Sequence, residues 1–305
     1  TGVLKHASNV PQCAMAIEEV FRSAGFPANV FRTLMISASQ VQSVIENPAI
    51  KAVTLTGSEP AGCQVAATAG ANLKKSVLEL GGSDAFVVLE DADMDRVVEN
   101  AVISRFLNTG QSCIAAKRFI VVDKIADEFL QRFKGAVEAL QPGDPMDATT
   151  TLAPMARADL RDELHKQVTD SIAAGAVAVT GCQPVDGPGA YYQPSILANI
   201  KSGMRAYEEE FFGPVALVIN ARDEDDALRI ANDSRFGLGG SVWSGDTARG
   251  EVFARQIQAG SVFVNGFVKS DPRLPFGGVK ASGYGRELSH QGMHEFLNVK
   301  TIWIR

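Results

Sequence analysis

At 305 residues the chain is long enough for two domains, and its composition of 46% hydrophobic and 21% charged residues is ordinary for a globular protein. The net charge of −6 offers no basic surface, so we expect no nucleic-acid partner. No apolar run reaches the length that crosses a bilayer and no export leader is recognisable, so we expect no membrane partner. The four cysteines are far apart and form no CxxC pair, which predicts a reduced, cytoplasmic location.

Short β-branched runs alternate with helical segments, a pattern typical of βαβ units and a mostly parallel sheet. The first part of the chain is predicted to contain three strands and two helices. In order these are a strand ending at Lys5, a helix from Val10 to Ala24, a strand from Ala52 to Thr56, a helix from Ser58 to about Leu73 and a strand from Ser76 to Leu80. The sequence therefore predicts an α/β fold that begins with a partial Rossmann-like domain.

A second domain is predicted after the double glycine Gly81-Gly82, with continued alternation of strands and helices. Its first elements are a strand from Ala85 to Leu89, a helix from Asp93 to Leu107, a strand from Arg118 to Val122 and a helix from Lys124 to Leu140. The last segment, Phe296 to Ile304, alternates well enough for a strand, and an apolar strand at a terminus is an unpaired edge that needs a partner.

Two short motifs carry the chemistry. Asn108-Thr109-Gly110-Gln111-Ser112-Cys113 places a cysteine after a Gly-Gln turn, and Glu79-Leu80-Gly81-Gly82 places a carboxylate before two glycines. A thiolate is a strong nucleophile, a nearby carboxylate can act as a general base, and the glycines permit close backbone approach. We expect a depressed pKa for Cys113. The alternative interpretation is a buried, inert cysteine and an ordinary solvated glutamate.

A third motif lies at a predicted helix start. No GxGxxG follows a strand, but Gly57-Ser58 precedes a helix whose free amide groups and positive dipole end could bind a pyrophosphate. By itself this motif is more often a simple helix cap. The pair His290 and His294 has a zinc-compatible spacing, but it lacks a third ligand, so no metal site is predicted.

The chain resembles the NAD(P)-dependent aldehyde dehydrogenases, and within them the bacterial succinate-semialdehyde dehydrogenases. The resemblance covers residues 1 to 305 and rests on six motifs in family order. They are Lys5-His6-Ala7-Ser8, Thr56-Gly57-Ser58, Glu79-Leu80-Gly81-Gly82, Gly110-Gln111-Ser112-Cys113, Glu210-Phe211-Phe212-Gly213-Pro214 and Pro275-Phe276-Gly277-Gly278-Val279-Lys280. About a third of the usual protein precedes the first motif, so the resemblance implies a chain that lacks its N-terminal third, including the Asn of the oxyanion hole.

The resemblance implies a partial NAD(P)-binding domain at 1–82, a catalytic domain at 83–288 and a C-terminal oligomerisation tail at 289–305, in a homodimer or homotetramer. It makes Cys113 the nucleophile that forms a thiohemiacetal and then a thioester, and Glu79 the base for hydrolysis. The residues it implies for NAD or NADP are Lys5, Ser8, Gly57, Ser58, Leu80, Glu210 and Phe212. Ser8 stands where NAD-preferring relatives often carry Glu, so use of both cofactors is expected.

The substrate implied is a small aldehyde, with succinate semialdehyde favoured. Relatives place an Arg before the Asn-Thr-Gly-Gln segment to bind the substrate carboxylate, whereas this chain has Leu107 there. Other groups that could take this role are Arg105, Lys117, Lys269, Arg273 and the hydroxyl of Ser270, of which Arg105 and Ser270 are our candidates. The alternatives are the same chemistry on another small aldehyde, or a catalytically silent fragment that acts as a binding or structural module.

Overall fold

The structure is a computed structural model that describes all 305 residues. It divides into two compact units, the first formed by Thr1–Thr54 and Cys63–Ser76 and the second by Leu55–Gly62 and Val77–Arg305. The expected α/β class is confirmed, and the larger sheet is mostly parallel. The predicted division at residues 82 and 288 stays a prediction.

The first unit contains a parallel pair of strands joined by a helix. Strand β1 (Gly2–Lys5) pairs in register with β2 (Phe31–Leu34), and α1 (Pro11–Ser23) connects them. Pro11 opens the helix, where its missing N–H costs nothing, and Gly25 follows its end at a φ of 80°. The short elements η1 (Ala38–Gln40) and α2 (Val41–Glu46) complete this part of the unit. The helix predicted from Val10 to Ala24 is thus confirmed.

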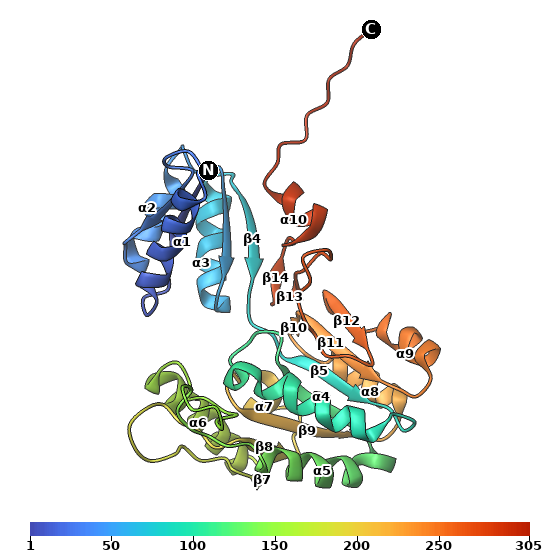
Figure 1. The fold of residues 1–305 in the computed structure, drawn as a ribbon. Helices are drawn as coiled ribbons and strands as arrows, with labels where there is room; N and C mark the ends of the chain where they lie inside the picture. Colours follow the sequence, from blue (N-terminus) through green and yellow to red (C-terminus); the bar gives the residue numbers. More distant parts are fainter. The chain divides into compact units, whose positions relative to one another are not determined.

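Three elements have residues in both units, because the chain changes unit within each of them. They are β3 (Ala52–Thr56), α3 (Glu59–Ala71) and β4 (Lys75–Glu79). In the second unit, β14 (Gly283–Tyr284) pairs antiparallel with the end of β4, with Gly283 opposite Glu79. Figure 1 shows β14 beside this end of β4. Segments far apart in the sequence therefore meet at Glu79.

The second unit is built on a seven-stranded sheet in the order β12-β11-β5-β6-β9-β8-β7, parallel except for β7. Its strands are β5 (Asp84–Val88), β6 (Ala116–Val122), β7 (Val177–Thr180), β8 (Ser195–Ala198), β9 (Val215–Ala221), β11 (Gly239–Trp243) and β12 (Ser261–Val264). Every residue of β5 and β6 is buried, as expected for central parallel strands covered on both faces.

Helices cover both faces of this sheet. On one face, Phe86 and Phe119 form a core with Phe129 and Phe133 of α5 (Asp123–Glu138) and with α4 (Met94–Phe106). On the other face, Val87 and Ile120 pack with α6 (Ala158–Ala173), α8 (Glu224–Asn232) and α9 (Thr247–Ala254). The remaining elements are α7 (Arg205–Glu208), α10 (Ser289–Glu295), η2 (Leu107–Gly110), β10 (Phe236–Gly237) and β13 (Val279–Lys280). The result is a three-layer α/β arrangement (Figure 1).

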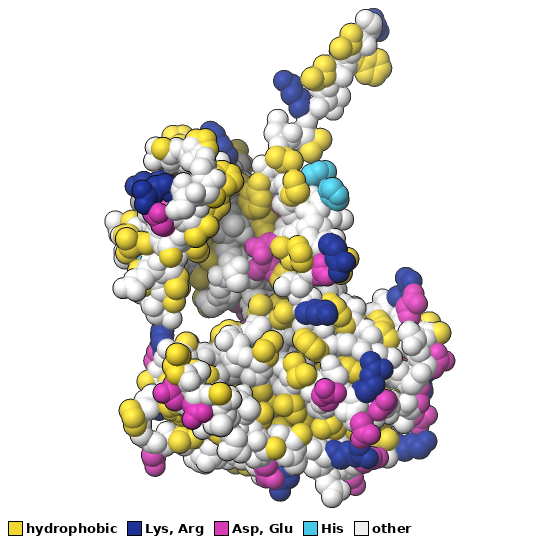
Figure 2. All heavy atoms as spheres, viewed as in Figure 1, with side chains coloured by type: hydrophobic (Ala, Val, Ile, Leu, Met, Phe, Trp, Pro, Cys, Tyr) yellow, Lys and Arg dark blue, Asp and Glu magenta, His cyan; other side chains and the backbone are white.

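The C-terminal segment differs from the prediction. Residues 296–305 form no strand, and Val299 and Ile304 are 89% and 87% exposed. A strand needs a hydrogen-bonded neighbour, and this chain offers none to the segment, so the alternating apolar side chains stand in the open. Figure 2 shows them as hydrophobic side chains along the projecting tail. No helix of the structure is long and apolar enough to cross a bilayer.

Candidate active site

The double glycine after Glu79 lies close to two other segments of the chain, one that carries Glu210 and one that carries Cys113. A Cβ added to Gly82 would lie 2.8 Å from the carbonyl oxygen of Cys113, and one added to Gly81 would clash with the Glu210 carboxylate. Only glycine allows so close a backbone approach. The expected close approach at this motif is therefore confirmed, and it brings Glu210 and the backbone of Cys113 to the chain that carries Glu79.

Glu79 is a buried carboxyl group without a hydrogen-bond partner. Its side chain is 2% exposed, and neither carboxyl oxygen is satisfied. Burial raises the pKa of Glu79 to about 7, the negative charge of Glu287 adds to this effect, and Arg286 opposes it. A buried unpaired carboxyl group is costly, and such groups concentrate at functional sites. A carboxyl group with a pKa near neutral pH can accept a proton from water as a general base.

The segment before the cysteine has a strained backbone. Asn108, Thr109 and Gly110 have φ values of 53°, 56° and 70°, and two of these residues carry side chains that make this conformation unfavourable. Hydrogen bonds hold the segment in place: the Thr109 hydroxyl donates to the carbonyl of Ala153 at 3.0 Å, and the Gln111 side chain accepts from the amide of Ala156 at 2.8 Å. We call residues 107–115 the nucleophile loop.

The depressed pKa expected for the Cys113 thiol is wrong for this structure. Burial raises the pKa of the Cys113 thiol, Lys117 lowers it, and Asp84 and Glu210 raise it further. The sequence shows a cation four residues away but not the depth of the thiol or the two nearby carboxylates. Cys13 and Cys63 are exposed, so accessibility alone does not single out Cys113 as the most reactive cysteine.

Glu210 lies between the glycine turn and a buried lysine. Its Oε1 accepts a hydrogen bond from the Gly82 amide at 3.1 Å and lies 3.2 Å from Nζ of Lys117. We call residues 209–213 the Glu210 loop. Phe212 in this loop is 38% exposed and lines a cavity of about 730 Å³ together with Leu107 and Gln111. The cavity therefore borders the nucleophile loop, and sequence patterns did not reveal it because its far wall comes from residues 140–160.

Two of the cations considered for a substrate carboxylate are occupied elsewhere. Arg105, predicted to bind substrate, is fully buried and donates to the carbonyls of Gly110, Ala116, Phe211 and Gly213 at 2.5–3.4 Å. Lys117 is also fully buried. The substrate role predicted for Arg105 is therefore wrong, because the side chain is fully buried and both terminal nitrogens donate to backbone carbonyls. Ser270 and Lys269 are exposed, and Arg273 pairs with Asp271.

The expected helix cap at Ser58 is confirmed. The Ser58 carbonyl accepts from the amide of Gly62 at 2.9 Å, which opens α3, and the amide of Gly57 donates to the carbonyl of Glu79 at 3.0 Å. A Cβ on Gly62 would lie 2.6 Å from the Leu80 side chain, so Leu80 packs against the first turn of α3. Gly57, Ser58 and Leu80 thus lie together in the second unit, and a phosphate could meet the free amides of the helix start.

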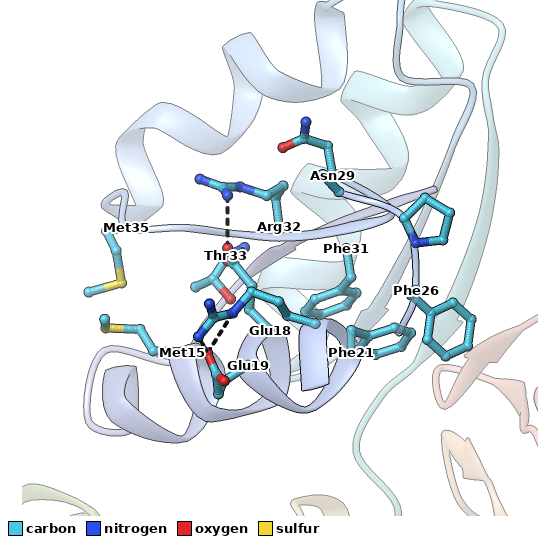
Figure 3. Close-up of a pocket in the computed structure, with 13 residues that line it drawn as sticks. Met15, Glu18, Glu19, Phe21, Phe26, Asn29, Phe31, Arg32, Thr33 and Met35 are labelled. Carbon is cyan, nitrogen blue, oxygen red and sulfur yellow. Dashed lines mark hydrogen bonds and ion pairs between the residues drawn. The ribbon is translucent and has the colours of Figure 1, made fainter. Parts of the chain in front are cut away.

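Lys5 and Ser8 lie at and just after the end of β1 in the first unit. This unit also has a cavity of about 590 Å³ between α1 and β2 (Figure 3). Its charged side chains pair with one another, since Glu18 contacts Arg32 at 3.0 Å and Glu19 pairs with Arg22. Phe21 and Phe31 stack beside them with ring centroids 4.8 Å apart. None of the predicted site residues lines this cavity.

The second unit has a mostly parallel sheet with helices on both faces, and a buried carboxyl group and the strained nucleophile loop meet at its double glycine. These features define an α/β protein with a candidate active site for covalent catalysis. The aldehyde dehydrogenase family model matches residues 1–302, and the chain belongs to this family. The resemblance inferred from the motifs is confirmed.

Similar proteins support the same family. The chain is 51% identical over 303 residues to a probable succinate-semialdehyde dehydrogenase (NADP(+)) of Synechocystis sp., covering 99% of the chain and 67% of that protein. It is also 51% identical to succinate-semialdehyde dehydrogenase (NADP(+)) 1 of Mycobacterium ulcerans, with 99% and 66% covered. A crystal structure of succinic semialdehyde dehydrogenase from Streptococcus pyogenes with NADP+ superposes with a TM-score of 0.97 at 42% identity, covering 99% and 66%. The chain therefore spans about two thirds of the length of these relatives.

Proposed function

We propose that the chain belongs to an enzyme that oxidises an aldehyde, with succinate semialdehyde favoured, to its carboxylic acid with NAD or NADP. The observation that carries this proposal is the unpaired, buried carboxyl group of Glu79, on a segment whose Gly82 lies close to the backbone of Cys113. A cysteine nucleophile and a carboxylate base with a pKa near neutral are the two groups that an acyl-enzyme mechanism needs.

In this mechanism the Cys113 thiolate adds to the aldehyde carbon to form a thiohemiacetal. NAD(P)+, when bound, supplies the acceptor for the hydride that leaves this carbon, and a thioester on Cys113 remains. Glu79 then takes a proton from water, the resulting hydroxide adds to the thioester carbon, and the carboxylic acid leaves as the Cys113 thiolate is released. The relatives with NADP in their names support the cofactor class. For the cofactor we propose Gly57, Ser58, Leu80, Glu210 and Phe212 in the second unit, and Lys5 and Ser8 in the first.

Ser8 is the residue for which we predict an effect on cofactor choice. It is exposed, and its hydroxyl can bond either a ribose or a phosphate without repelling it. Ser8→Glu should weaken NADP binding much more than NAD binding, because a carboxylate that faces a phosphate costs about 1–3 kcal/mol. Titration of both cofactors into wild type and variant measures the effect. Ser8→Gln is the matched control without charge, and an equal ratio of affinities in all three proteins would remove Ser8 from the cofactor site.

The pKa of Glu79 predicts how deacylation depends on pH. Only the ionised carboxyl group accepts a proton, so the rate of thioester hydrolysis should rise as pH increases through about 7 and level off above it. The free energy of unfolding should depend on pH in the opposite direction. Because the folded-state pKa is raised, the stabilising contribution is full below the ordinary value of 4.5 and is lost as pH rises through about 7. Single-turnover hydrolysis and thermal melting at pH 5–9 measure both, and Glu79→Gln should flatten both dependences.

The substrate is tested with a panel of aldehydes of similar length. Since Arg105 and Lys117 are engaged inside the protein, Ser270 and Lys269 are the groups of this chain that we propose for a substrate carboxylate. Succinate semialdehyde should then be oxidised with a higher kcat/KM than butanal, and Ser270→Ala should narrow this ratio. A preference for butanal would instead support the alternative of a different small aldehyde. The exposed apolar tail at 296–305 supports a homodimer or homotetramer, and we propose a cytoplasmic location.

A further inference from the structure

Two buried cations, Arg105 and Lys117, bridge the nucleophile loop and the Glu210 loop. Arg105 joins the carbonyls of Gly110 and Ala116 to those of Phe211 and Gly213. Lys117 makes a second bridge between these two segments, and its contacts include the carbonyl of Cys113 itself. The nucleophile loop and the Glu210 loop are thus held together by two positive charges, although about a hundred residues separate them in the sequence.

Lys117 uses all three of its ammonium protons in this bridge. Its Nζ donates to the carbonyls of Ser112 at 2.8 Å and Cys113 at 2.7 Å, and it lies 3.2 Å from Oε1 of Glu210. The side chain is fully buried, whereas that of Glu210 is 19% exposed. Burial of an ammonium group is costly, and a site that served only for packing could be filled by an apolar side chain of similar volume.

We propose that Lys117 is a positioning residue that couples the nucleophile to Glu210, so that the backbone of Cys113 and the direction of the Glu210 carboxylate are set by one ammonium group. This inference rests on the proposed function, since it takes Cys113 as the nucleophile and Glu210 as the cofactor-binding carboxylate. It assigns Lys117 to the reaction by a contact that the motif pattern does not contain, and it replaces the substrate-binding role considered for this residue.

The charge of Lys117 also acts on the thiol. The charged groups that influence the Cys113 thiol are Lys117, Asp84 and Glu210, and of these only Lys117 favours the thiolate. Asp84 comes from β5 and Glu210 from the Glu210 loop, so the cation stands among opposing charges from separate elements. Removal of the lysine charge should therefore make the thiol less acidic, which a purely structural role in the loop would not do.

Peptide-resolved alkylation of Cys113 with iodoacetamide at pH 6–10 tests the proposal on the 305-residue chain. Lys117→Met should slow alkylation at pH 7 about tenfold and raise the midpoint of the pH profile by about one unit, because loss of a nearby opposite charge shifts a pKa by one unit or more. Lys117→Arg keeps the charge and should retain most of the rate. The matched control is Lys124→Met, which removes an exposed lysine paired with Glu90. An unchanged profile in Lys117→Met would overturn the proposal.

The second arm tests the link to Glu210. Glu210→Gln should speed alkylation of Cys113 when Lys117 is present and should have a smaller effect in the Lys117→Met background. Equal effects in the two backgrounds would show that the residues act separately and would refute the coupling. Exposed Cys63 reports accessibility in every sample, and thermal melting reports folding; Lys117→Gln replaces Lys117→Met where the latter does not fold. Alkylation requires no turnover, so the result stands apart from the test of aldehyde oxidation.

Discussion

Glu79→Gln is expected to stall the reaction at the thioester while the first burst of reduced cofactor is retained. Glutamine has nearly the same shape as glutamate but cannot take a proton from water, and general-base assistance is worth about 10²–10⁴-fold. Hydrolysis should therefore slow by that factor, whereas addition of Cys113 to the aldehyde and hydride transfer should continue. The neutral amide should also fit the buried position well, since the Glu79 carboxyl group has no partner to lose.

Cys113→Ala is the matched variant that separates the two halves of the reaction. Without the thiol no thiohemiacetal forms, so both the burst and steady-state turnover should disappear. Intact-mass measurement after mixing with aldehyde and cofactor should detect an acyl adduct on Glu79→Gln and none on Cys113→Ala. The measurement should be made both on this chain and on a longer version that matches the length of its relatives. Steady-state turnover by Glu79→Gln at the wild-type rate would exclude Glu79 as the base.

Most of the local structure follows from the sequence because hydrophobic period and helix caps are local signals. The strand predicted from Ala52 to Thr56 has these bounds in the structure, and the helix predicted from Asp93 to Leu107 spans Met94–Phe106. Asp93 caps this helix by accepting from the amide of Arg96 at 3.3 Å, as an aspartate before an apolar period should. The parallel sheet follows from the alternation of such elements.

The electrostatics of the site could not be predicted in the same way. Lys117 and Arg105 look like surface charges in the sequence because their acceptors on the Glu210 loop are about a hundred residues away. The pKa of Cys113 depends on burial and on Asp84 and Glu210, which only the fold brings near. The tail illustrates the same limit: Phe296 to Ile304 has the pattern of a strand, but strand formation depends on a neighbour that the pattern does not contain.

The raised pKa of Glu79 likewise has a long-range origin. The β14 region that pairs with β4 carries Arg286 and Glu287, and a Cβ on Gly277 would lie 2.9 Å from a Glu79 oxygen. Gly277 belongs to the motif Phe276-Gly277-Gly278, and Arg286 and Glu287 follow it in the sequence. The motif Phe276-Gly277-Gly278 is far from Glu79 in the sequence, and the structure places its Gly277 beside the carboxyl group.

Arg105→Leu is expected to destabilise the second unit strongly. The change leaves the carbonyls of Gly110, Ala116, Phe211 and Gly213 without their shared donor in a site that water does not reach. Each buried group left unsatisfied costs about 1–3 kcal/mol, so a loss of at least about 3 kcal/mol in the free energy of unfolding is expected. Arg105→Lys should lose less, because an ammonium group can still reach some of these acceptors.

Urea denaturation followed by Trp243 fluorescence measures this loss, because Trp243 is 2% exposed within the core of the second unit and the other tryptophan, Trp303, lies in the exposed tail. Arg132→Leu is the matched control: its side chain is 45% exposed and pairs with Asp95 and Glu128, and a surface pair of this kind contributes about 0–1 kcal/mol. A substrate-binding arginine would behave differently, since its loss would raise KM for an acidic aldehyde and leave unfolding unchanged. An Arg105→Leu protein as stable as Arg132→Leu would therefore return Arg105 to the substrate site, whereas a large loss of stability assigns it to the support of the two loops on which Cys113 and Glu210 stand.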